Sequence, residues 1–422
     1  MNPGFTYLNG ILQAEAVSLL DLAQAVGTPC YVYSHEMIVN AWKSFDEALG
    51  THPHQICYAV KANSNLAVLN TLAQLGSGFD IVSGGELARV IAAGGHLPHV
   101  VFSGVGKKPE ELAEALKQKI GCFNLESETE LITLNQIAQH LNVKAPIAFR
   151  VNPDVDPKSH PYISTGRKEN KFGVPIGEAL RLYQQACELP HIHITGLACH
   201  IGSQITTLSP FIDALRHLRT LIESLDAAGI RLQHLNVGGG LGVRYQNEVP
   251  PSIGDYIEAI KQGCPPGLPL ILEPGRAIVA QAGVLLTQIL SLKSAGEKHF
   301  CIVDAGMNDL LRPTLYQAWQ AILPLKQPSL SEETPQSRER IYDVVGPICE
   351  SGDFLGKDRA LRVSPGEILA ISASGAYGFV MSSHYNSRPR AAEVMVKGKD
   401  FQIVRQRETL SALFENEGIW LK

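Results

Sequence analysis

The sequence predicts an α/β fold, in which a (β/α)8 TIM barrel is joined to a second, β-rich domain of the barrel or sandwich kind. The first observation is that eight short apolar runs between Ile56 and Glu273 alternate with segments whose apolar residues recur at helical spacing. The second is that the chain after about residue 277 is rich in strand patterns and shows little helical periodicity. Eight strands with helical crossovers match a barrel in number and length, and a doubly wound sheet is the alternative.

The predicted barrel strands are nearly continuous apolar runs. Strands of a parallel barrel are covered on both faces, so their side chains do not alternate between apolar and polar. In chain order the runs read ICYAV, FDIVS, HVVFS, IGCFNL, PIAFRV, ITGLAC, QHLNV and PLILE. The seven segments between them predict crossover helices over 65–76, 85–95, 109–118, 128–141, 176–189, 209–229 and 253–263.

The second domain is predicted from the two ends of the chain. GFTYLNGILQ near the N-terminus has the pattern of a β-hairpin, and strand patterns recur between IVAQAGVLL and FQIVR. Helical patterns are limited there to RPTLYQAWQAI and the C-terminus. We therefore expect a barrel domain over 30–275 and a β-rich domain made of 1–29 and 276–422. The polar stretch around Glu332 is expected to be a surface excursion, and whether it closes over a site is left open.

Length and composition exclude several classes of function. With 422 residues, of which 45% are hydrophobic and 18% charged, the chain has ample material for a core, and its net charge of -5 does not favour nucleic acid as a partner. No apolar run approaches the roughly 18 residues that span a bilayer, and the N-terminus lacks a secretory pattern, so we expect a cytoplasmic protein without membrane contact. The eight cysteines are scattered without a CxxC pair, so we predict neither a disulfide framework nor a metal site.

Functional side chains follow nearly every predicted strand. A barrel builds its active site from the C-terminal ends of its strands, so these residues should converge on one mouth. They are Lys61, Asp80, Ser83, Ser103, Glu126, Arg150, Asn152, His200, Ser203, Gly238 to Gly240, Glu273 and Arg276. A rim that served stability alone would not need so many charged groups.

Lys61 is the least ordinary of these residues. It follows the apolar run ICYAV just before a helical segment, where a plain turn would use Asn, Asp, Ser or Gly. Taken alone, such a lysine is more often structural, with a buried stem, than an amine that attacks a carbonyl carbon. Its neighbours favour the second interpretation.

Two of those neighbours supply what a phosphorylated ring would need. Gly238 to Gly240 follow the seventh strand, where barrels often bind phosphate, although a tight turn also explains a glycine run. Glu273 ends the eighth strand, where an unpaired buried carboxylate is unfavourable, although a surface pair with Arg276 is the ordinary alternative. A protonated pyridine nitrogen would pair with this carboxylate. Lysine, glycines and carboxylate together indicate pyridoxal 5'-phosphate.

The sequence also contains a set of motifs in a fixed order. YAVKAN, GFDIVSGGE, HIGSQ, NVGGGLG, EPGR, CESGD and GAYG cover almost the whole chain. This set resembles the barrel-type pyridoxal-phosphate decarboxylases that are related to alanine racemase. DAGMNDLLRPTLY and GPICESGD resemble the diaminopimelate decarboxylase branch in particular. The resemblance implies the fold predicted above and a decarboxylation as the reaction.

The resemblance also implies roles for the rim residues. Lys61 would form the Schiff base, His200 would stack on the cofactor ring, and Glu273 would face the pyridine nitrogen. An arginine takes the place of Glu273 in alanine racemases, so the glutamate favours decarboxylation over racemisation. Asp80 and Arg150 match rim positions near the lysine, but a structural ion pair explains them nearly as well. The residues implied to hold the phosphate are Ser203, Gly238, Gly239, Gly240, Gly275, Arg276 and Tyr377.

Cys349 differs from the other cysteines because it lies in a polar loop beside Glu350 and Ser351, rather than in an apolar run. The ordinary interpretation is a small buried residue. The resemblance implies that its thiol returns a proton to the substrate carbon after carbon dioxide leaves, and that the second subunit of a homodimer contributes it. Each active site would then be shared between two chains.

Charge also constrains the substrate. Two cations and an anion suit an amino-acid head group, because a guanidinium pairs with a carboxylate and Glu350 pairs with an ammonium group. Ornithine has no distal carboxylate and would leave an arginine charge unpaired. The substrate-binding residues implied by the resemblance are Arg276, Arg312, Tyr316, Glu350 and Tyr377.

The resulting interpretation is decarboxylation of meso-2,6-diaminopimelate to L-lysine and carbon dioxide, the last step of lysine biosynthesis. Decarboxylation of ornithine, arginine or carboxynorspermidine remains an alternative that LRPTLY should separate. An amino-acid racemase is a second alternative, and Glu273 counts against it. A cofactor-carrying homeostasis protein would be a barrel alone, which the β-rich C-terminal part disfavours.

Overall fold

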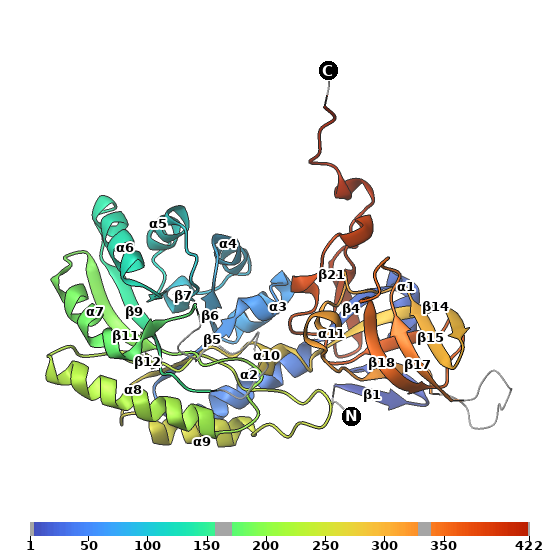
Figure 1. Cartoon of the computed structure of the whole chain (residues 1–422), viewed down its shortest axis with the longest axis horizontal. Coiled ribbons are helices and arrows are strands. Elements are labelled where there is room, and N and C mark those ends of the chain that lie inside the picture. The colour runs from blue at the N-terminus through green and yellow to red at the C-terminus, as the bar shows by residue number, and fades with distance from the viewer. Residues whose placement is uncertain (1–3, 157–170, 328–338, 421–422) are drawn as a thin grey trace. The chain divides into compact units, whose positions relative to one another are not determined.

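The computed structural model describes residues 4–156, 171–327 and 339–420 (Figure 1). The chain forms two compact units. One consists of Met1–Ile38, Tyr245–Asn247 and Ile278–Lys422, and the other of Val39–Arg244 and Glu248–Ala277. The first is the β-rich unit and the second is the barrel unit.

The barrel unit contains a closed sheet of parallel strands. Among the described residues, eight strands pair in chain order, and the last strand pairs with the first. The strands are β5 (His54–Ala59), β6 (Gly78–Ile81), β7 (Val100–Phe102), β8 (Cys122–Leu125), β9 (Ala145–Asn152), β11 (Ile192–Ala198), β12 (His234–Asn236) and β13 (Leu270–Leu272). A short strand, β10 (Val174–Pro175), adds to β9. The predicted barrel is confirmed, and the doubly wound sheet is excluded.

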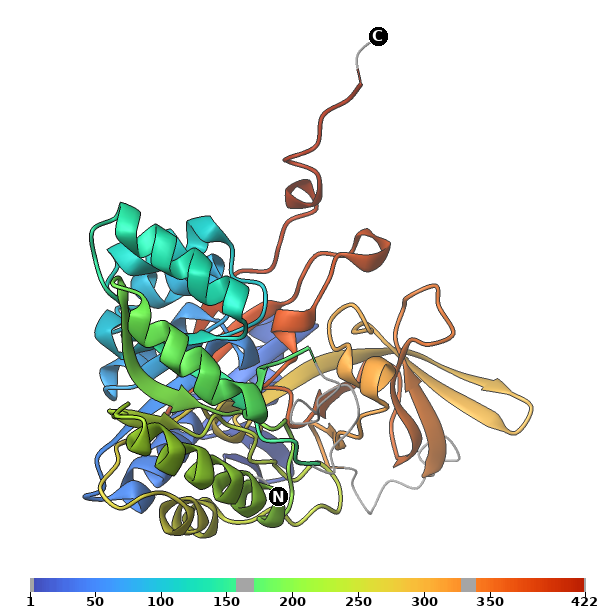
Figure 2. The same ribbon diagram turned by 60° about the vertical axis from the view of Figure 1, so that its left-hand side comes forward.

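Helices surround these strands on the outside, as Figures 1 and 2 show. Each predicted crossover helix is present, and several begin with a side-chain cap, such as Ser83, Ser127 and Ser252. Buried apolar side chains of the strands, among them Val101, Ala148 and Ile271, fill the barrel interior. The helices are α3 (Leu66–Gln74), α4 (Gly84–Ala92), α5 (Pro109–Lys117), α6 (Glu128–His140), α7 (Ile176–Glu188), α8 (Ser209–Ala227) and α9 (Ile253–Gly263).

The β-rich unit is built on a mixed sheet in the order β18-β17-β15-β14-β4-β20-β21, with β19 pairing β14 and β16. A separate sheet holds β1 (Phe5–Leu8), β2 (Ile11–Ala14) and β3 (Val17–Ser18), which confirms the N-terminal hairpin. The strands of the mixed sheet are β4 (Cys30–Ser34), β14 (Gly283–Ala295), β15 (Lys298–Val303), β16 (Ile322–Pro324), β17 (Arg340–Val345), β18 (Phe354–Leu361), β19 (Ile368–Ile371), β20 (Ala392–Lys397) and β21 (Asp400–Arg405).

Two features of this unit differ from the expectation. The fully buried strand β4 pairs with β14 and β20, so the N-terminal part of the unit runs through β4 to Ile38 rather than ending at residue 29. The C-terminal segment forms a short 3-10 helix at Ser411–Leu413, because the helical pattern there is too short to bury an apolar face. The remaining helices are α1 (Leu19–Val26), α2 (His35–Leu49), α10 (Arg276–Val279) and α11 (Arg312–Tyr316).

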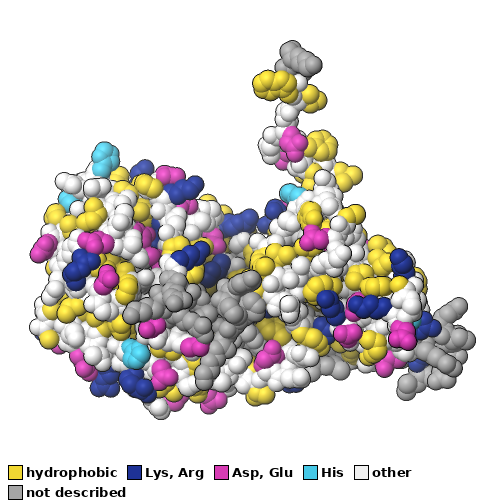
Figure 3. Space-filling view, in the orientation of Figure 1, with side chains coloured by type: hydrophobic (Ala, Val, Ile, Leu, Met, Phe, Trp, Pro, Cys, Tyr) yellow, Lys and Arg dark blue, Asp and Glu magenta, His cyan; other side chains and the backbone are white. Residues whose placement is uncertain are grey.

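The surface carries a mixture of charges. Figure 3 shows Lys, Arg, Asp and Glu side chains interspersed on the visible face. No helix in the described part of the chain combines the length and apolar character that crossing a bilayer requires. Most of the polar excursion around Glu332 lies outside the described residues.

Candidate active site

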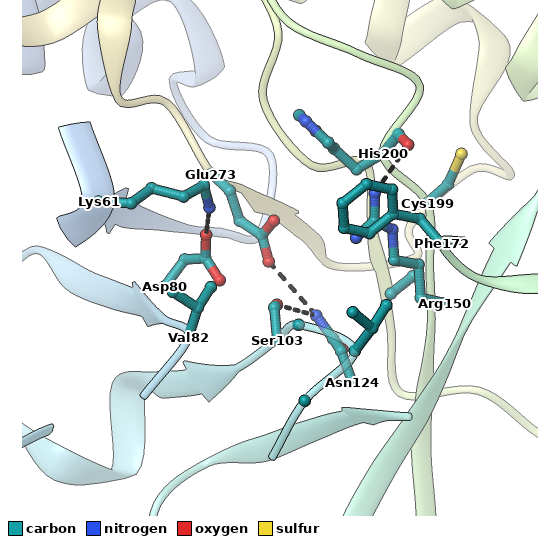
Figure 4. Close-up of a pocket in the computed structure, with 14 residues that line it drawn as sticks. Lys61, Asp80, Val82, Ser103, Asn124, Arg150, Phe172, Cys199, His200 and Glu273 are labelled. Atoms are coloured by element: carbon teal, nitrogen blue, oxygen red, sulfur yellow. Dashed lines mark hydrogen bonds and ion pairs between the residues drawn. The ribbon is translucent and has the colours of Figure 1, made fainter. Parts of the chain in front are cut away.

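A cavity of about 350 Å³ opens at the C-terminal ends of the barrel strands. Side chains from separate strands point toward one another there (Figure 4). The lining residues are Lys61, Asp80, Val82, Ser103, Gly104, Val105, Gly106, Asn124, Arg150, Phe172, Ala198, Cys199, His200 and Glu273. The predicted convergence of rim residues on one mouth is therefore observed for Lys61, Asp80, Ser103, Arg150, His200 and Glu273.

Lys61 lies in a 3-10 turn, Val60–Ala62, that follows strand β5. Its ammonium group forms an ion pair with Asp80 Oδ2 at the end of the neighbouring strand, β6 (Figure 4). The Asp80 side chain is fully buried, and the Lys61 side chain is 38% exposed. The lysine nitrogen is thus held at the cavity wall while the side chain stays accessible from the mouth.

Glu273 follows β13, is buried and lines the cavity. Its Oε1 accepts hydrogen bonds from the side-chain amides of Asn236 (2.6 Å) and Asn124 (3.4 Å). Burial, followed by the negative charge of Asp80, raises the pKa of the Glu273 carboxyl to about 8, although Lys61 opposes the shift. This carboxyl group therefore favours a neutral form unless a cation lies against it.

His200 follows β11 and presents a neutral imidazole to the cavity. Its Nδ1 accepts a hydrogen bond from the Gly239 backbone N–H over 3.2 Å. Burial lowers the pKa of His200 well below its ordinary value, and the positive charges of Arg150 and Lys61 lower it further. A neutral ring with a fixed orientation offers an aromatic face rather than a charge.

The glycine run has backbone conformations and packing that larger residues cannot adopt. Gly238 and Gly240 have φ values of +67° and +110°. A Cβ atom on Gly239 would lie 2.2 Å from the Glu273 carbonyl oxygen, and one on Gly240 would lie 2.5 Å from the Gly202 carbonyl oxygen. The turn therefore packs directly against the loop that contains His200 and Ser203.

Ser203 and Arg276 meet beside this turn. The Arg276 guanidinium donates hydrogen bonds to Ser203 Oγ from Nη2 over 3.0 Å and from Nε over 3.3 Å, and the arginine is buried. A hydroxyl, a guanidinium and a glycine turn thus lie together, which is a set of groups suited to a phosphate.

Arg150 connects three parts of the rim. Its Nη1 donates to Glu126 Oε1 over 3.0 Å, its Nη2 donates to the His200 carbonyl oxygen over 3.3 Å, and its guanidinium lies over the Phe172 ring at 4.7 Å. Glu126 Oε2 also accepts from the Gly173 backbone N–H over 2.6 Å. The sequence identified Arg150 as a rim residue, and the structure shows the residues that it holds in place.

Asn152 and Gly275 belong to the barrel unit, and five other predicted residues lie in the β-rich unit. Arg312 begins α11, is buried, and stacks its guanidinium over the Tyr245 ring at 4.3 Å. Tyr316 ends the same helix. Cys349 and Glu350 lie in the exposed turn between β17 and β18, and Tyr377 has a φ of +55° in the loop after β19.

Sequence reasoning missed Asn124, Asn236 and Phe172. Both asparagines are buried and donate to Glu273, and Phe172 lines the cavity. The available signal was the position of the two asparagines in the sequence, since Asn124 lies one residue before the end of IGCFNL and Asn236 lies two residues before the glycine run. Ser103, which was named at the rim, accepts from the Asn124 amide over 3.0 Å.

Comparison with known proteins assigns this arrangement to a family. Residues 35–280 match the family model described as pyridoxal-dependent decarboxylase, pyridoxal binding domain. The chain is 56% identical to the diaminopimelate decarboxylase of Vibrio cholerae over 413 residues, which cover 97% of each chain. It is 54% identical to that of Pseudomonas aeruginosa, with 98% of this chain and 99% of the relative covered. The chain belongs to the diaminopimelate decarboxylase family.

Solved structures of diaminopimelate decarboxylases have the same fold. The enzyme of Helicobacter pylori complexed with L-lysine has a TM-score of 0.90 and 44% identity, and the match covers 95% of this chain and 99% of that one. The enzyme of M. jannaschii in complex with L-lysine has a TM-score of 0.92 and 36% identity, with 99% and 98% covered.

The residues of the barrel unit fit the pyridoxal cofactor of this family. Among the described residues, Asp80 Oδ1 is buried without a hydrogen-bond partner, and the hydrogen bonds to Glu273 reach Oε1 alone. A cationic ring nitrogen would pair with the buried Glu273 carboxylate. The Ser203–Arg276 pair beside the glycine turn suits the phosphate. The charge pattern of this cavity therefore matches the pyridoxal cofactor of the family.

Proposed function

We propose that this protein decarboxylates meso-2,6-diaminopimelate to L-lysine and carbon dioxide with pyridoxal 5'-phosphate as cofactor. The proposal is carried by the 56% identity to a diaminopimelate decarboxylase over 97% of the chain. It is also supported by the cavity, whose lysine, neutral imidazole and buried glutamate suit that cofactor. Two of the solved diaminopimelate decarboxylase structures are complexes with L-lysine, which is the product that this reaction would give.

The barrel residues have distinct tasks in this proposal. Lys61 holds the cofactor covalently, and the ion pair with Asp80 fixes the position of its nitrogen. His200 supplies a flat neutral surface for the ring, and Glu273 places a negative charge at the pyridine nitrogen. When bound, the cofactor would supply a place for the electron pair that remains as carbon dioxide departs. Glu273 strengthens this capacity because its charge keeps a proton on the ring nitrogen.

The residues that hold the phosphate are proposed to be Ser203, Arg276, the backbone of Gly238 to Gly240 and Gly275, and the hydroxyl of Tyr377. Support for the barrel members of this set comes from the contact of Arg276 with Ser203 and from the close packing of the glycines. The phosphate-binding role of Tyr377 rests on the sequence resemblance alone. A phosphate bound by these groups would fix the distance between the cofactor ring and Lys61.

The β-rich unit is proposed to supply the substrate-binding residues and the acid. Arg312 pairs with the distal carboxylate, Glu350 binds the distal ammonium group, and Tyr316 adds a hydroxyl. The Cys349 thiol gives a proton to the carbon that has lost carbon dioxide. Cys349 lies in an exposed turn, and we propose that it reaches the cavity of a second copy of the chain in a homodimer.

The test is to incubate the purified protein with pyridoxal phosphate and meso-diaminopimelate and to measure carbon dioxide and L-lysine together. Equal amounts of the two products are expected. Ornithine, arginine and carboxynorspermidine are supplied in parallel, and faster release of carbon dioxide from one of them would replace the proposed substrate. Interconversion of enantiomers without carbon dioxide would indicate a racemase.

A further inference from the structure

The turn that carries Cys349 and Glu350 is held by a second segment of the β-rich unit. The turn connects β17 to β18, and the second segment, residues 383–388, lies between β19 and β20. Asn386 Oδ1 accepts a hydrogen bond from the Cys349 backbone N–H over 2.9 Å. The Tyr385 hydroxyl donates to Glu350 Oε2 over 2.7 Å. Adjacent residues of one segment thus contact adjacent residues of the other.

The supporting segment is attached to the unit at both ends. The Ser383 backbone N–H donates to the Asn308 carbonyl oxygen over 2.9 Å, and Arg388 Nη2 donates to the Asp304 carbonyl oxygen over 3.0 Å. The segment therefore has little freedom to move away from the turn that it contacts.

Between these attachments the backbone adopts an unfavourable conformation. Asn386 and Ser387 have φ values of 56° and 53°, so two consecutive residues other than glycine are left-handed. Such conformations persist where the surroundings determine them, and they cluster at functional positions. Here the conformation directs the Tyr385 hydroxyl and the Asn386 amide at the same turn.

The turn is also held by residues other than Tyr385 and Asn386. The buried Asp353 carboxylate accepts from the backbone N–H groups of Ile348 (2.8 Å) and Met307 (2.6 Å). Cys349 and Glu350 follow Ile348 and are exposed. The Asp353 backbone N–H donates to the Glu350 carbonyl oxygen over 3.0 Å, and Thr314 Oγ1 donates to the Gly352 carbonyl oxygen over 2.8 Å. Asn386 and Tyr385 add the contacts to the Cys349 backbone N–H and to the Glu350 carboxylate.

We propose that Tyr385 and Asn386 are positioning residues for the active site, acting on Glu350 and Cys349 respectively. The inference rests on the proposed function, since it uses the roles assigned there to the carboxylate and the thiol. Asn386 fixes the backbone of Cys349 and hence the direction of its thiol. Tyr385 fixes the orientation of the Glu350 carboxylate toward the distal ammonium group of the substrate.

The two residues should have different kinetic effects because they act through different groups. Loss of the Asn386 acceptor should lower kcat, since the thiol delivers its proton after substrate has bound. Loss of the Tyr385 hydroxyl should raise KM, since Glu350 contributes to substrate binding. A merely structural role would lower the stability of both variants without this division.

Asn386 can be tested with variants that separate its side chain from its backbone. Asn386→Gly keeps access to positive φ and removes the acceptor, whereas Asn386→Asp keeps both. We expect kcat to fall about tenfold in Asn386→Gly with KM within about twofold, and to be restored to within about threefold in Asn386→Asp. Asn142→Gly is the matched control, because Asn142 also has a positive φ, of 53°, in an exposed turn after α6. Equal losses in Asn386→Gly and Asn386→Asp would overturn the role of this residue.

Tyr385→Phe removes one hydroxyl group and keeps the ring. We expect KM for diaminopimelate to rise about fivefold, with kcat within about twofold. Tyr342→Phe on β17 is the control, since it removes a hydroxyl from the same unit. Wild-type KM in Tyr385→Phe would overturn the role of this residue.

A measurement without substrate separates the inference from the proposed function. Iodoacetamide labelling followed by peptide mapping gives the alkylation rate of Cys349, with the exposed Cys187 as the internal reference. In Asn386→Gly the rate at Cys349 should change about threefold or more while the rate at Cys187 does not. If the wild-type protein releases no carbon dioxide from diaminopimelate, the proposed function fails, but this labelling result still stands. Unchanged labelling of Cys349 in Asn386→Gly would show that the hydrogen bond does not position the thiol.

Discussion

The side-chain amide of Asn236 donates a hydrogen bond to Glu273 Oε1 over 2.6 Å, and both side chains are buried at the ends of adjacent barrel strands. The opposite end of the same side chain, Oδ1, accepts from the Gly238 backbone N–H over 2.9 Å. Asn236 therefore joins the glycine turn to the carboxylate. The two elements proposed to bind the phosphate and the ring are kept at a fixed spacing by one residue.

The raised pKa of Glu273 predicts a pH-dependent stability of the cofactor-free protein. Its pKa is about 8 in the folded state against an ordinary value of 4.5, so the folded state binds more protons between these values. The free energy of unfolding should therefore fall as pH rises through this range, by on the order of 1 kcal/mol per pH unit. Glu273→Gln should reduce the slope by about this amount, while other buried carboxyls such as Glu86, whose pKa burial raises to about 7, keep their own contribution. Urea unfolding of both cofactor-free proteins between pH 5 and 8 measures the difference, and parallel curves would contradict the assignment.

Lys61→Ala should reduce turnover about a thousandfold or more and abolish the visible absorption of the bound cofactor, because the covalent attachment is lost. Borohydride reduction of the wild-type holoenzyme and peptide mapping identify the lysine that carries the pyridoxyl group. Lys144→Ala, at an exposed site before β9, is the control and should keep wild-type activity. A pyridoxyl group on a lysine other than Lys61 would refute the site.

Gly239→Ala should weaken cofactor binding, since a Cβ atom there would lie 2.2 Å from the Glu273 carbonyl oxygen and the turn must shift. We expect the dissociation constant for pyridoxal phosphate to rise about tenfold or more. Gly177→Ala is the matched control, because its Cβ would meet no atom within 4 Å. Fluorescence titration measures both constants. Equal affinities would show that the turn does not approach the cofactor.

Arg312→Ala should change substrate preference. We expect kcat/KM for diaminopimelate to fall about a hundredfold, and kcat/KM for a diamino acid without the distal carboxylate to fall less than about threefold. Arg359→Ala is the control, since Arg359 is also buried in this unit and stacks on Trp319 at 4.3 Å. An equal loss for both substrates would mean that Arg312 supports the unit rather than recognition.

Mixed dimers test whether Lys61 and Cys349 of one active site come from different chains. Lys61→Ala and Cys349→Ala homodimers should both be impaired, whereas a mixed dimer contains one intact site and one site with both changes. Random exchange of equal amounts makes about half of the dimers mixed, so activity should recover to about a quarter of wild type.

Exchange must first be demonstrated with differently tagged chains, because dimers that do not exchange would give no recovery for a trivial reason. If tagged mixed dimers form and activity stays at the level of the parent variants, both residues act in the site of a single chain.

The barrel could be predicted because its strands are covered on both faces and so appear as uninterrupted apolar runs. The β-rich unit was harder to predict, because several of its strands are not covered on both faces and do not appear as uninterrupted apolar runs. Strand β18, which reads FLGKDRAL, exposes Lys357 and Asp358 next to each other and buries Arg359, so it has neither an apolar run nor a regular alternation. Strand β4 pairs with strands from distant parts of the sequence. Such pairings depend on tertiary contacts that local patterns do not record.

The candidate site, too, could be predicted from the sequence only in part. Lys61, His200 and Glu273 could be identified because a charged or titratable group after an apolar strand is unusual. Asparagine is common in ordinary turns, so Asn124 and Asn236 do not stand out in the sequence. Their contact with Glu273 exists only when the sheet closes. The support of Arg150 by Glu126 likewise joins strand ends that the sequence places apart.

The pairing of β13 with β5 has a consequence for how the protein is made. Lys61 follows the first barrel strand and Glu273 follows the last, so a growing chain on the ribosome exposes the lysine long before the carboxylate exists. Until β13 has emerged and joined β5, the nascent barrel has an open edge and no complete place for the cofactor. Capture of pyridoxal phosphate should therefore be among the last events of barrel synthesis, and cofactor added during translation should have no partner before that point.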